Sequence, residues 1–255
     1  MKRVRLFHLV YMIEKIEGIV LDIVKHSDRH NVVTLYTRSR GRMAFLSTAS
    51  KGKVGKMKNS RIMPLACISA DINLKGNRDL HLLPSVAPIC VWRTLYFDPV
   101  KSSLVFFLSE FLNNLLRHSQ ADTNLWDFIR DSLFRLDETP SDKLANFHIA
   151  FLVRLLPLVG INPPVSDYRN GDFFNMEKAE FISNPISRNA PNLLNQYDSS
   201  TLPVLSRINF ENNHLFRFSR QNRQRTLSLL LRYYSLHLPV SSNLKTLEIL
   251  HSLFD

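Results

Sequence analysis

The chain has 255 residues, of which 45% are hydrophobic and 22% charged, and its formal net charge is +11. This apolar fraction is typical of a folded protein with a core, and it excludes intrinsic disorder, collagen-like chains and coiled coils. Two cysteines, Cys67 and Cys90, are too few for the disulfide framework of a small secreted protein. Because no apolar run is long enough to span a membrane, the composition predicts a soluble cytoplasmic protein with no membrane partner.

The positive charge is concentrated in the first third of the chain. Residues 1–80 contain 16 Lys and Arg against six acidic residues, whereas the remaining 175 residues are almost neutral. Five of the seven glycines also lie in the first 80 residues. This uneven composition predicts two domains: residues 1–88, with a short extension at 1–12, and residues 89–255.

Runs of β-branched and aromatic residues predict strands in the first domain. The expected strands cover residues 17–25, 31–37, 43–47, 62–68 and 80–86. Gly41 lies in the turn between the second and third strands, as in a β-hairpin. Five short strands with one long loop after the third fit a small closed β-barrel.

The second domain has the periodicity of helices. Asp98 and Pro99 form a typical helix start, in which a capping side chain precedes a proline at the first helical position. The expected helices cover residues 99–116, 122–136, 146–159, 219–237 and 244–254. Residues 161–200 are rich in Asn, Ser and Pro and predict an irregular insert. The sequence therefore predicts an α+β fold in which a five-stranded barrel precedes an all-α domain.

Patterns that would indicate an enzyme or a metal site are missing from the sequence. Residues 52–57 resemble a phosphate-binding loop, but the glycines are three apart rather than five, and Met57 stands where a magnesium-binding Ser or Thr is needed. Asp127 and Asp131 lie one helical turn apart, which is more typical of a solvated helix face than of an acid–base pair. The histidines lack metal-ligand spacing, and the two cysteines lie 23 residues apart. We therefore expect no catalytic residue, no metal and no cofactor.

The strongest functional signal is a cluster of basic residues between residues 38 and 61, where no acidic residue occurs. Arginines alternate along the hairpin turn, so in an extended chain they point to the same side, and lysines follow in a loop with glycines. This charge density favours a polyanionic partner, because each neutralised phosphate releases counterions. A solvated basic loop is the alternative. The predicted DNA-binding residues are Arg38, Arg40, Arg42, Lys51, Lys53, Lys56, Lys58 and Arg61.

Two aromatic residues, Tyr36 and Phe45, lie on the strands beside this cluster. Their rings could stack on nucleic-acid bases, although packing in the barrel core is the more common role of such residues. A smaller basic cluster surrounds the start of the late helix. Arginines at a helix N-terminus favour a nearby anion, and salt bridges to acids of the helical domain are the alternative. We assign no role to its members, Arg217, Arg220, Arg223 and Arg225.

Several segments of the chain resemble the RecO family of bacterial recombination mediators. They follow one another in the right order over residues 12–254: EGIVL at 17–21, LYTR at 35–38, GR at 41–42, FHIAFLVRLLPLVG at 147–160, LRYYSLHL at 231–238 and LKTLEIL at 244–250. RecO proteins combine an oligonucleotide-binding (OB) barrel with a helical domain, so the resemblance implies an OB-fold. Many members bind zinc through four cysteines after the central helix. Residues 159–182 contain no cysteine, so the resemblance implies a variant without zinc.

The resemblance implies a non-enzymatic DNA repair and recombination mediator of the RecF pathway, associated with the nucleoid. Such proteins bind single- and double-stranded DNA and anneal complementary strands. They help RecA to load onto DNA coated by single-strand-binding protein, with RecR and often RecF as partners. The helical domain would take the tail of single-strand-binding protein in an apolar pocket edged by a basic residue. The residues leave two alternatives open: an RNA-binding barrel protein, and a scaffold whose main partner is an acidic protein surface.

Overall fold

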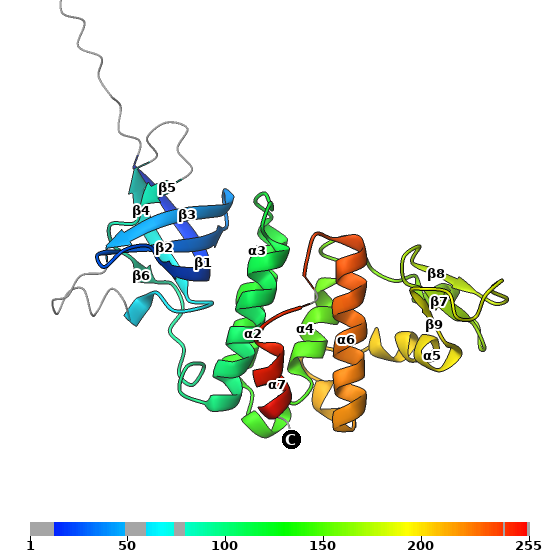
Figure 1. The fold of residues 1–255 in the computed structure, drawn as a ribbon. Coiled ribbons are helices and arrows are strands. Elements are labelled where there is room, and N and C mark those ends of the chain that lie inside the picture. Colours follow the sequence, from blue (N-terminus) through cyan, green and yellow to red (C-terminus); the bar gives the residue numbers. More distant parts are fainter. Residues whose placement is uncertain (1–12, 49–59, 74–79, 242, 254–255) are drawn as a thin grey trace, which may run out of the picture. The chain divides into compact units, whose positions relative to one another are not determined.

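The computed structural model describes residues 13–48, 60–73, 80–241 and 243–253. These residues form two compact units, which are described separately (Figure 1). The first comprises the described part of residues 1–91 together with His118–Trp126, and the second comprises Trp92–Arg117 and the described part of residues 127–255. The predicted domain boundary after residue 88 puts residues 118–126 in the helical domain. In the structure, this segment belongs to the first unit and contacts its β2–β3 hairpin.

A twisted six-stranded sheet forms the first unit (Figure 1). Its strands are β1 (Ile13–Lys25), β2 (His30–Thr37), β3 (Gly41–Thr48), β4 (Cys67–Asn73), β5 (Leu80–Leu82) and β6 (Ala87–Pro88), arranged in the order β5-β3-β2-β1-β4-β6. The β3–β5 pair is parallel and the other pairs are antiparallel. A bulge between Val20 and Asp22 interrupts β1, which pairs with both β2 and β4.

The expected five-stranded closed barrel is corrected in three respects. The edge strands β5 and β6 are not joined by a hydrogen-bonded ladder, so the pairings of the described strands give an open sheet. The expected strand at 80–86 ends at Leu82, and β6 (Ala87–Pro88) follows it as a separate strand. The expected strand at 62–68 begins only at Cys67, since Leu65 has a φ of 58°, a left-handed conformation that ends a strand.

The core of the first unit lies on one face of this sheet. Alternating residues of β1, β2, β3 and β4 point to that face, as the period of two requires. The cluster contains Ile16, Val20, Val33, Leu35, Phe45, Ile68, Ala70, Ile72, Leu83 and Val86, all buried. The runs of β-branched and aromatic residues that predicted β1 to β3 thus supply residues of this core.

Helices dominate the second unit. The helices given for the described residues are α2 (Pro99–Leu115), α3 (Thr123–Glu138), α4 (Phe147–Leu155), α5 (Gln196–Leu205), α6 (Arg220–His237) and α7 (Leu247–Leu253), with short 3-10 helices at Ser141–Lys143, Val165–Asp167 and Asn213–Leu215. The expected helix starts are confirmed by their caps: the Asp98 carboxylate accepts the N–H groups of Val100 and Lys101, and Ser219 Oγ accepts that of Asn222. None of the described helices is long and apolar enough to cross a membrane.

The segment expected to be irregular contains a small antiparallel sheet. Its strands are β7 (Phe173–Asn175), β8 (Glu180–Ile182) and β9 (Leu193–Leu194), in the order β8-β7-β9. The Phe174 and Phe181 rings lie 4.8 Å apart, and the buried Asp172 carboxylate accepts hydrogen bonds from Arg169 N–H and Ser183 Oγ–H. The α+β class is confirmed, but the second unit is not all-α. Strands of two or three residues are too short to show alternation in the sequence.

Candidate functional site

The turn between β2 and β3 presents three of the predicted DNA-binding arginines, Arg38, Arg40 and Arg42. Inside the turn, the buried Thr37 hydroxyl donates to Gly41 O at 2.8 Å and accepts from Arg40 N–H at 3.1 Å. These bonds hold the turn closed. Lys51, Lys53, Lys56 and Lys58 lie outside the described residues.

Arg38 is positioned by contacts with β1 and with the first turn of α3. Its main-chain N–H donates to Glu17 O at 2.9 Å, and its Nη1 lies 3.8 Å from a Glu17 carboxylate oxygen. The guanidinium carbon lies 5.3 Å from the centre of the buried Trp126 ring, which is cation–π distance. The side chain remains 41% exposed, so one face of the guanidinium is fixed while part of it meets solvent.

Arg40 forms a closer pair with Glu14 of β1. Its Nε donates to both carboxylate oxygens at 3.0 and 3.1 Å, and its Nη2 donates to Oε2 at 2.6 Å. These hydrogen bonds hold the pKa of Glu14 below its usual value and raise that of Arg40. Both side chains are partly exposed, 47% for Arg40 and 31% for Glu14. The pair is therefore accessible to an incoming anion.

The other two described arginines of the predicted set have different surroundings. Arg42 is half-buried, and its main-chain N–H donates to Ser119 O at 3.2 Å. Arg61 is exposed, and its Nη1 donates to Val86 O at 3.1 Å. Arg61 thus joins the segment before β4 to the segment before β6.

The proposed base-stacking residues are both in the core. Tyr36 and Phe45 have no exposed surface, so neither ring offers a face to a base. The Tyr36 hydroxyl donates to Gln120 O at 3.3 Å, and burial raises the pKa of Tyr36 to about 12. The stacking interpretation is wrong, because Phe45 lies in the core cluster and Tyr36, on the opposite face of its strand from Leu35, is fully buried as well.

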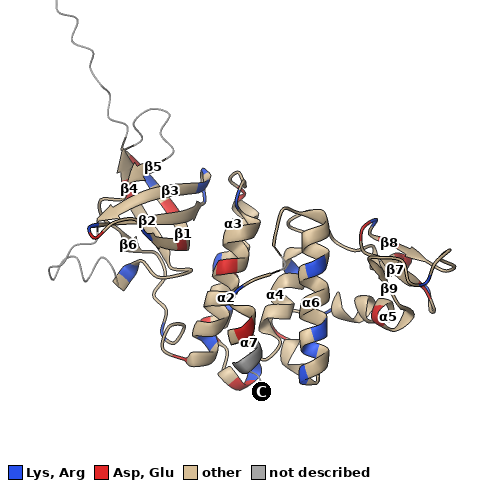
Figure 2. Ribbon diagram, viewed as in Figure 1, with Lys and Arg blue, Asp and Glu red and all other residues tan. Residues whose placement is uncertain are grey.

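The four arginines of the second basic cluster have different surroundings. Arg217 and Arg220 are exposed, whereas Arg223 Nε donates to Asn146 Oδ1 at 3.0 Å. Arg225 forms a two-point ion pair with Asp198 of α5. Figure 2 shows α6 carrying basic residues without acidic ones, in agreement with its sequence. Arg225 therefore forms a salt bridge to an acidic residue of the helical domain, which was one of the two alternatives from the sequence.

A site that the sequence did not reveal is an apolar pocket of about 140 Å³ in the second unit. It lies among α4, α5, α6, the short sheet and the segment after α4, which are distant from one another in the chain. Its apolar lining includes Leu156, Val165, Phe174, Leu202, Leu205, Phe218 and Leu230. A cavity of comparable volume, about 150 Å³, holds benzene in an engineered protein, so this pocket has room for one aromatic or large aliphatic side chain.

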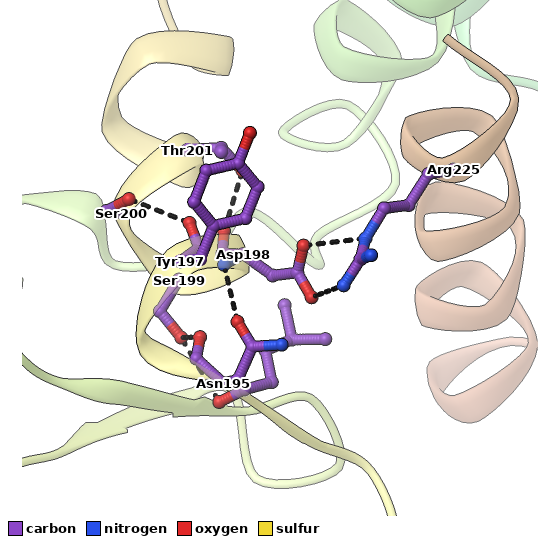
Figure 3. Close-up of polar contacts among 8 residues, drawn as sticks. Asn195, Tyr197, Asp198, Ser199, Ser200, Thr201 and Arg225 are labelled. Carbon is purple, nitrogen blue, oxygen red and sulfur yellow. Dashed lines mark hydrogen bonds and ion pairs between the residues drawn. The ribbon is translucent and has the colours of Figure 1, made fainter. Parts of the chain in front are cut away.

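The pocket lining also contains polar groups, two of which are buried without a hydrogen-bond partner among the described residues. Tyr233 is only 4% exposed, and its hydroxyl has no hydrogen-bond partner among the described residues. Burial raises the pKa of Tyr233 to about 12, so the hydroxyl stays protonated and available as a donor. Arg154 Nε is also buried and unpartnered within the described chain. Arg225 and Asp198 also belong to the polar part of the lining (Figure 3).

The acidic pair on α3 is held by an arginine, and its two members differ in exposure, 31% for Asp127 and 62% for Asp131. Arg130 lies between Asp127 and Asp131, with N–O distances of 2.8 Å to each. Among the described residues, no three His, Cys, Asp or Glu side chains come together as metal ligands would. The sites of the described chain are thus a basic turn, suited to anions, and an apolar pocket with arginines in its lining.

Known families match both parts of the chain in order. The family description "Recombination protein O N terminal" matches residues 12–90, and "Recombination protein O C terminal" matches residues 96–248. The DNA repair protein RecO of Bacteroides fragilis is 35% identical over 248 residues, covering 96% of this chain and 100% of that protein. The protein of the same name from Porphyromonas gingivalis is 35% identical over 247 residues, covering 93% and 98%. The chain therefore belongs to the RecO family.

Proposed function

We propose that this chain is a DNA repair and recombination mediator that binds single- and double-stranded DNA. The observation that carries the proposal is the basic first unit, whose exposed arginines meet at the β2–β3 turn, in a chain that matches proteins named for DNA repair over nearly its full length. Cationic side chains on a small sheet suit phosphates, because counterion release supplies affinity irrespective of base sequence.

Strand annealing follows from the same electrostatics without a catalytic residue. Two DNA strands repel each other through their phosphates, and a cationic surface that holds both strands lowers this repulsion and raises their local concentration. Base pairing then supplies the driving force, and no covalent bond of the nucleic acid changes. The proposed mediator is accordingly not an enzyme.

The apolar pocket suits the tail of single-strand-binding protein. A terminal aromatic or aliphatic side chain would fill the 140 Å³ cavity, while Arg154 and Arg225 would meet the acidic groups of the tail. Docking there would bring the protein to coated DNA. The protein would then act with RecR, and with RecF where it takes part, to allow RecA to load in the cytoplasm.

Salt-dependent DNA binding tests the proposal. Fluorescence anisotropy of a labelled single-stranded oligonucleotide, titrated across a salt series, should give a log–log slope of about −3 to −5, which corresponds to roughly four to seven neutralised phosphates at about 0.7 per contact. Arg42→Glu with Lys53→Glu should weaken binding at low salt. Lys143→Glu with Lys178→Glu, two exposed residues of the second unit, makes the same change in net charge and should leave the affinity nearly unchanged.

Two outcomes would contradict the proposal. A negligible salt slope would mean that phosphates do not bind the basic surface. Equal losses in both double variants would mean that net charge, and not this surface, governs binding. Competition with an RNA oligonucleotide of the same sequence decides between the nucleic acids: if RNA displaces the DNA at a much lower concentration, the protein is an RNA-binding protein instead.

A further inference from the structure

Two acidic residues of β1 occupy the arginines that the proposed DNA surface presents. Glu14 binds Arg40 through three hydrogen bonds of 2.6 to 3.1 Å, and Glu17 lies 3.8 Å from Arg38. Both pairs join β1 to the β2–β3 turn, across 26 residues of chain for Glu14 and Arg40. The antiparallel β1–β2 register, with Gly18 opposite Thr37, brings the start of β1 beside the turn.

The geometry of the Glu14–Arg40 pair determines which side of the Arg40 guanidinium is open to a phosphate. Glu14 takes the side of the Arg40 guanidinium formed by Nε and Nη2. That side is one of the two at which an arginine can hold a phosphate with two parallel hydrogen bonds. The Arg40 hydrogen bonds lower the pKa of Glu14, so the carboxylate is charged at neutral pH and stays in competition.

This competition should be measurable as a smaller release of DNA counterions. An arginine that is already paired with a carboxylate adds little positive charge to the surface, and it releases few DNA counterions when a phosphate replaces the carboxylate. The displaced Glu14 carboxylate would then lie within a few ångströms of the phosphate and repel it. The number of effective phosphate contacts is therefore smaller than the number of arginines at the turn.

We infer that Glu14, assisted by Glu17, competes with DNA phosphates for the turn arginines and limits the affinity of the protein for DNA. This inference rests on the proposed DNA-binding function and names residues that regulate that same surface. Restrained affinity suits a mediator, because a protein that loads another onto DNA must leave the strand. Glu14 and Glu17 thus set how readily the surface releases DNA.

The test removes each carboxylate with little change of shape. Glu14→Gln should steepen the log–log salt slope by about 0.7 for single-stranded DNA, the value of one additional neutralised phosphate. The same slope change gives about fivefold tighter binding at 0.1 M salt. Glu17→Gln should change the slope in the same direction and by less, because its ion pair is longer.

Asp28→Asn is the matched control. Asp28 pairs with Lys25 at 3.0 Å in the turn before β2, at the opposite end of that strand from Arg40. The substitution removes one negative charge from an exposed pair, as Glu14→Gln does, and should leave the slope unchanged. The double variant Glu14→Gln with Arg40→Gln should return the slope to that of the wild type, because the two changes cancel at one site.

The outcomes separate the inference from the proposed function. If the wild type binds DNA with a salt-dependent slope but Glu14→Gln and Glu17→Gln behave like Asp28→Asn, the competition is overturned and the function stands. If all three variants steepen the slope equally, the effect is one of net charge, and the inference is again overturned. If the wild type lacks salt-dependent binding, the proposed function itself fails.

Discussion

Arg225 of α6 and Asp198 of α5 form a two-point ion pair beside the apolar pocket. Arg225 Nε donates to Asp198 Oδ1 at 2.8 Å, and Nη2 donates to Oδ2 at 2.5 Å (Figure 3). The two partners differ in exposure: the Asp198 side chain is 8% exposed, whereas that of Arg225 is 51% exposed. The pair fastens the start of α5 to α6, and with them two walls of the pocket.

The unequal exposure predicts an unequal effect of breaking this pair. Arg225→Met leaves a buried carboxylate without its counter-ion and should lower the free energy of unfolding by about 1–3 kcal/mol. Asp198→Asn leaves an exposed guanidinium that water can solvate, and should cost about 1 kcal/mol or less. Urea unfolding followed by far-UV circular dichroism measures both. Equal losses would show that Asp198 is solvated when its partner is removed.

Binding of an acidic peptide to the pocket should be weakened by a negative charge introduced into the pocket lining, but not by one introduced beside the pocket. Leu202 lines the pocket, whereas Val204, on the same helix, is 54% exposed and outside the lining. Leu202→Glu should weaken binding of a labelled acidic peptide with a C-terminal phenylalanine by about tenfold or more, because the new carboxylate repels the peptide and occupies apolar space. Val204→Glu adds the same charge and should change the affinity little. Equal affinities for the two variants would exclude this pocket as the peptide site.

Two glycines with similar backbone angles should differ in their tolerance of a methyl group. Gly41 has a φ of 70° and Gly160 a φ of 76°. A Cβ on Gly41 would lie 2.5 Å from Ser119 O, whereas a Cβ on Gly160 would meet nothing within 4 Å. Gly160→Ala should therefore cost about 1–2 kcal/mol, the strain of a left-handed alanine, and Gly41→Ala should cost more, because the backbone at Ser119 must also move.

Thermal unfolding compares the two glycine variants, and hydrogen exchange at residues 30–48 locates the damage. Faster exchange of the β2–β3 hairpin in Gly41→Ala, but not in Gly160→Ala, is the expected result. If both variants lose the same stability and the hairpin amides exchange at the wild-type rate, the segment at 118–121 does not pack against the turn.

A buried carboxylate at the end of α3 should make stability depend on pH. Burial by itself raises the pKa of Asp137, but hydrogen bonds from the N–H groups of Arg93, Thr94 and Leu95, at 2.7 to 2.9 Å, and from the Thr94 hydroxyl outweigh burial and hold the pKa below its usual value. A carboxyl group whose pKa is lowered by folding stabilises the native state above its unfolded pKa, which is about 3.9 for Asp. This contribution is lost as the pH falls through the folded pKa.

Asp137→Asn tests this pH dependence. The substitution should lower the free energy of unfolding by about 1–3 kcal/mol at pH 7, and the difference from the wild type should shrink at pH 3 and below. Asp131→Asn, at an exposed position on the same helix, should have a small effect at both pH values. A deficit of Asp137→Asn that persists unchanged at low pH would mean that lost packing, and not the charge, is responsible.

Local chemistry accounts for the elements that the sequence predicted well. The start of α2 depends on Asp98 and Pro99, and the start of α6 on Ser219, all within three residues of the groups that they cap. Strands β1 to β3 carry the β-branched and aromatic residues that a sheet favours, and consecutive residues of β1 and β2 are buried. The strands β7 to β9 were missed because each is too short for a pattern, and their packing depends on distant rings, such as Phe174 against Tyr233.

The candidate sites show the same division. The predicted hairpin places Arg38 and Arg40 at the β2–β3 turn, where both lie, but the sequence carried no information on the partners of these arginines. For Tyr36 and Phe45, the sequence alone allows either a core or a surface position. Only the packed sheet shows that both rings are buried.

The sequence by itself determined the basic first third, the β-then-α order and the resemblance to RecO proteins, because composition, capping and periodicity act over a few residues. Tertiary structure alone decided which arginines are paired and where a cavity lies. Glu14 and Arg40 meet across 26 residues, and Asp198 and Arg225 across 27. The pocket lining comes from segments between Val153 and Tyr233. Such contacts depend on how whole elements pack, and side-chain pairing across elements has no periodic signal in the chain.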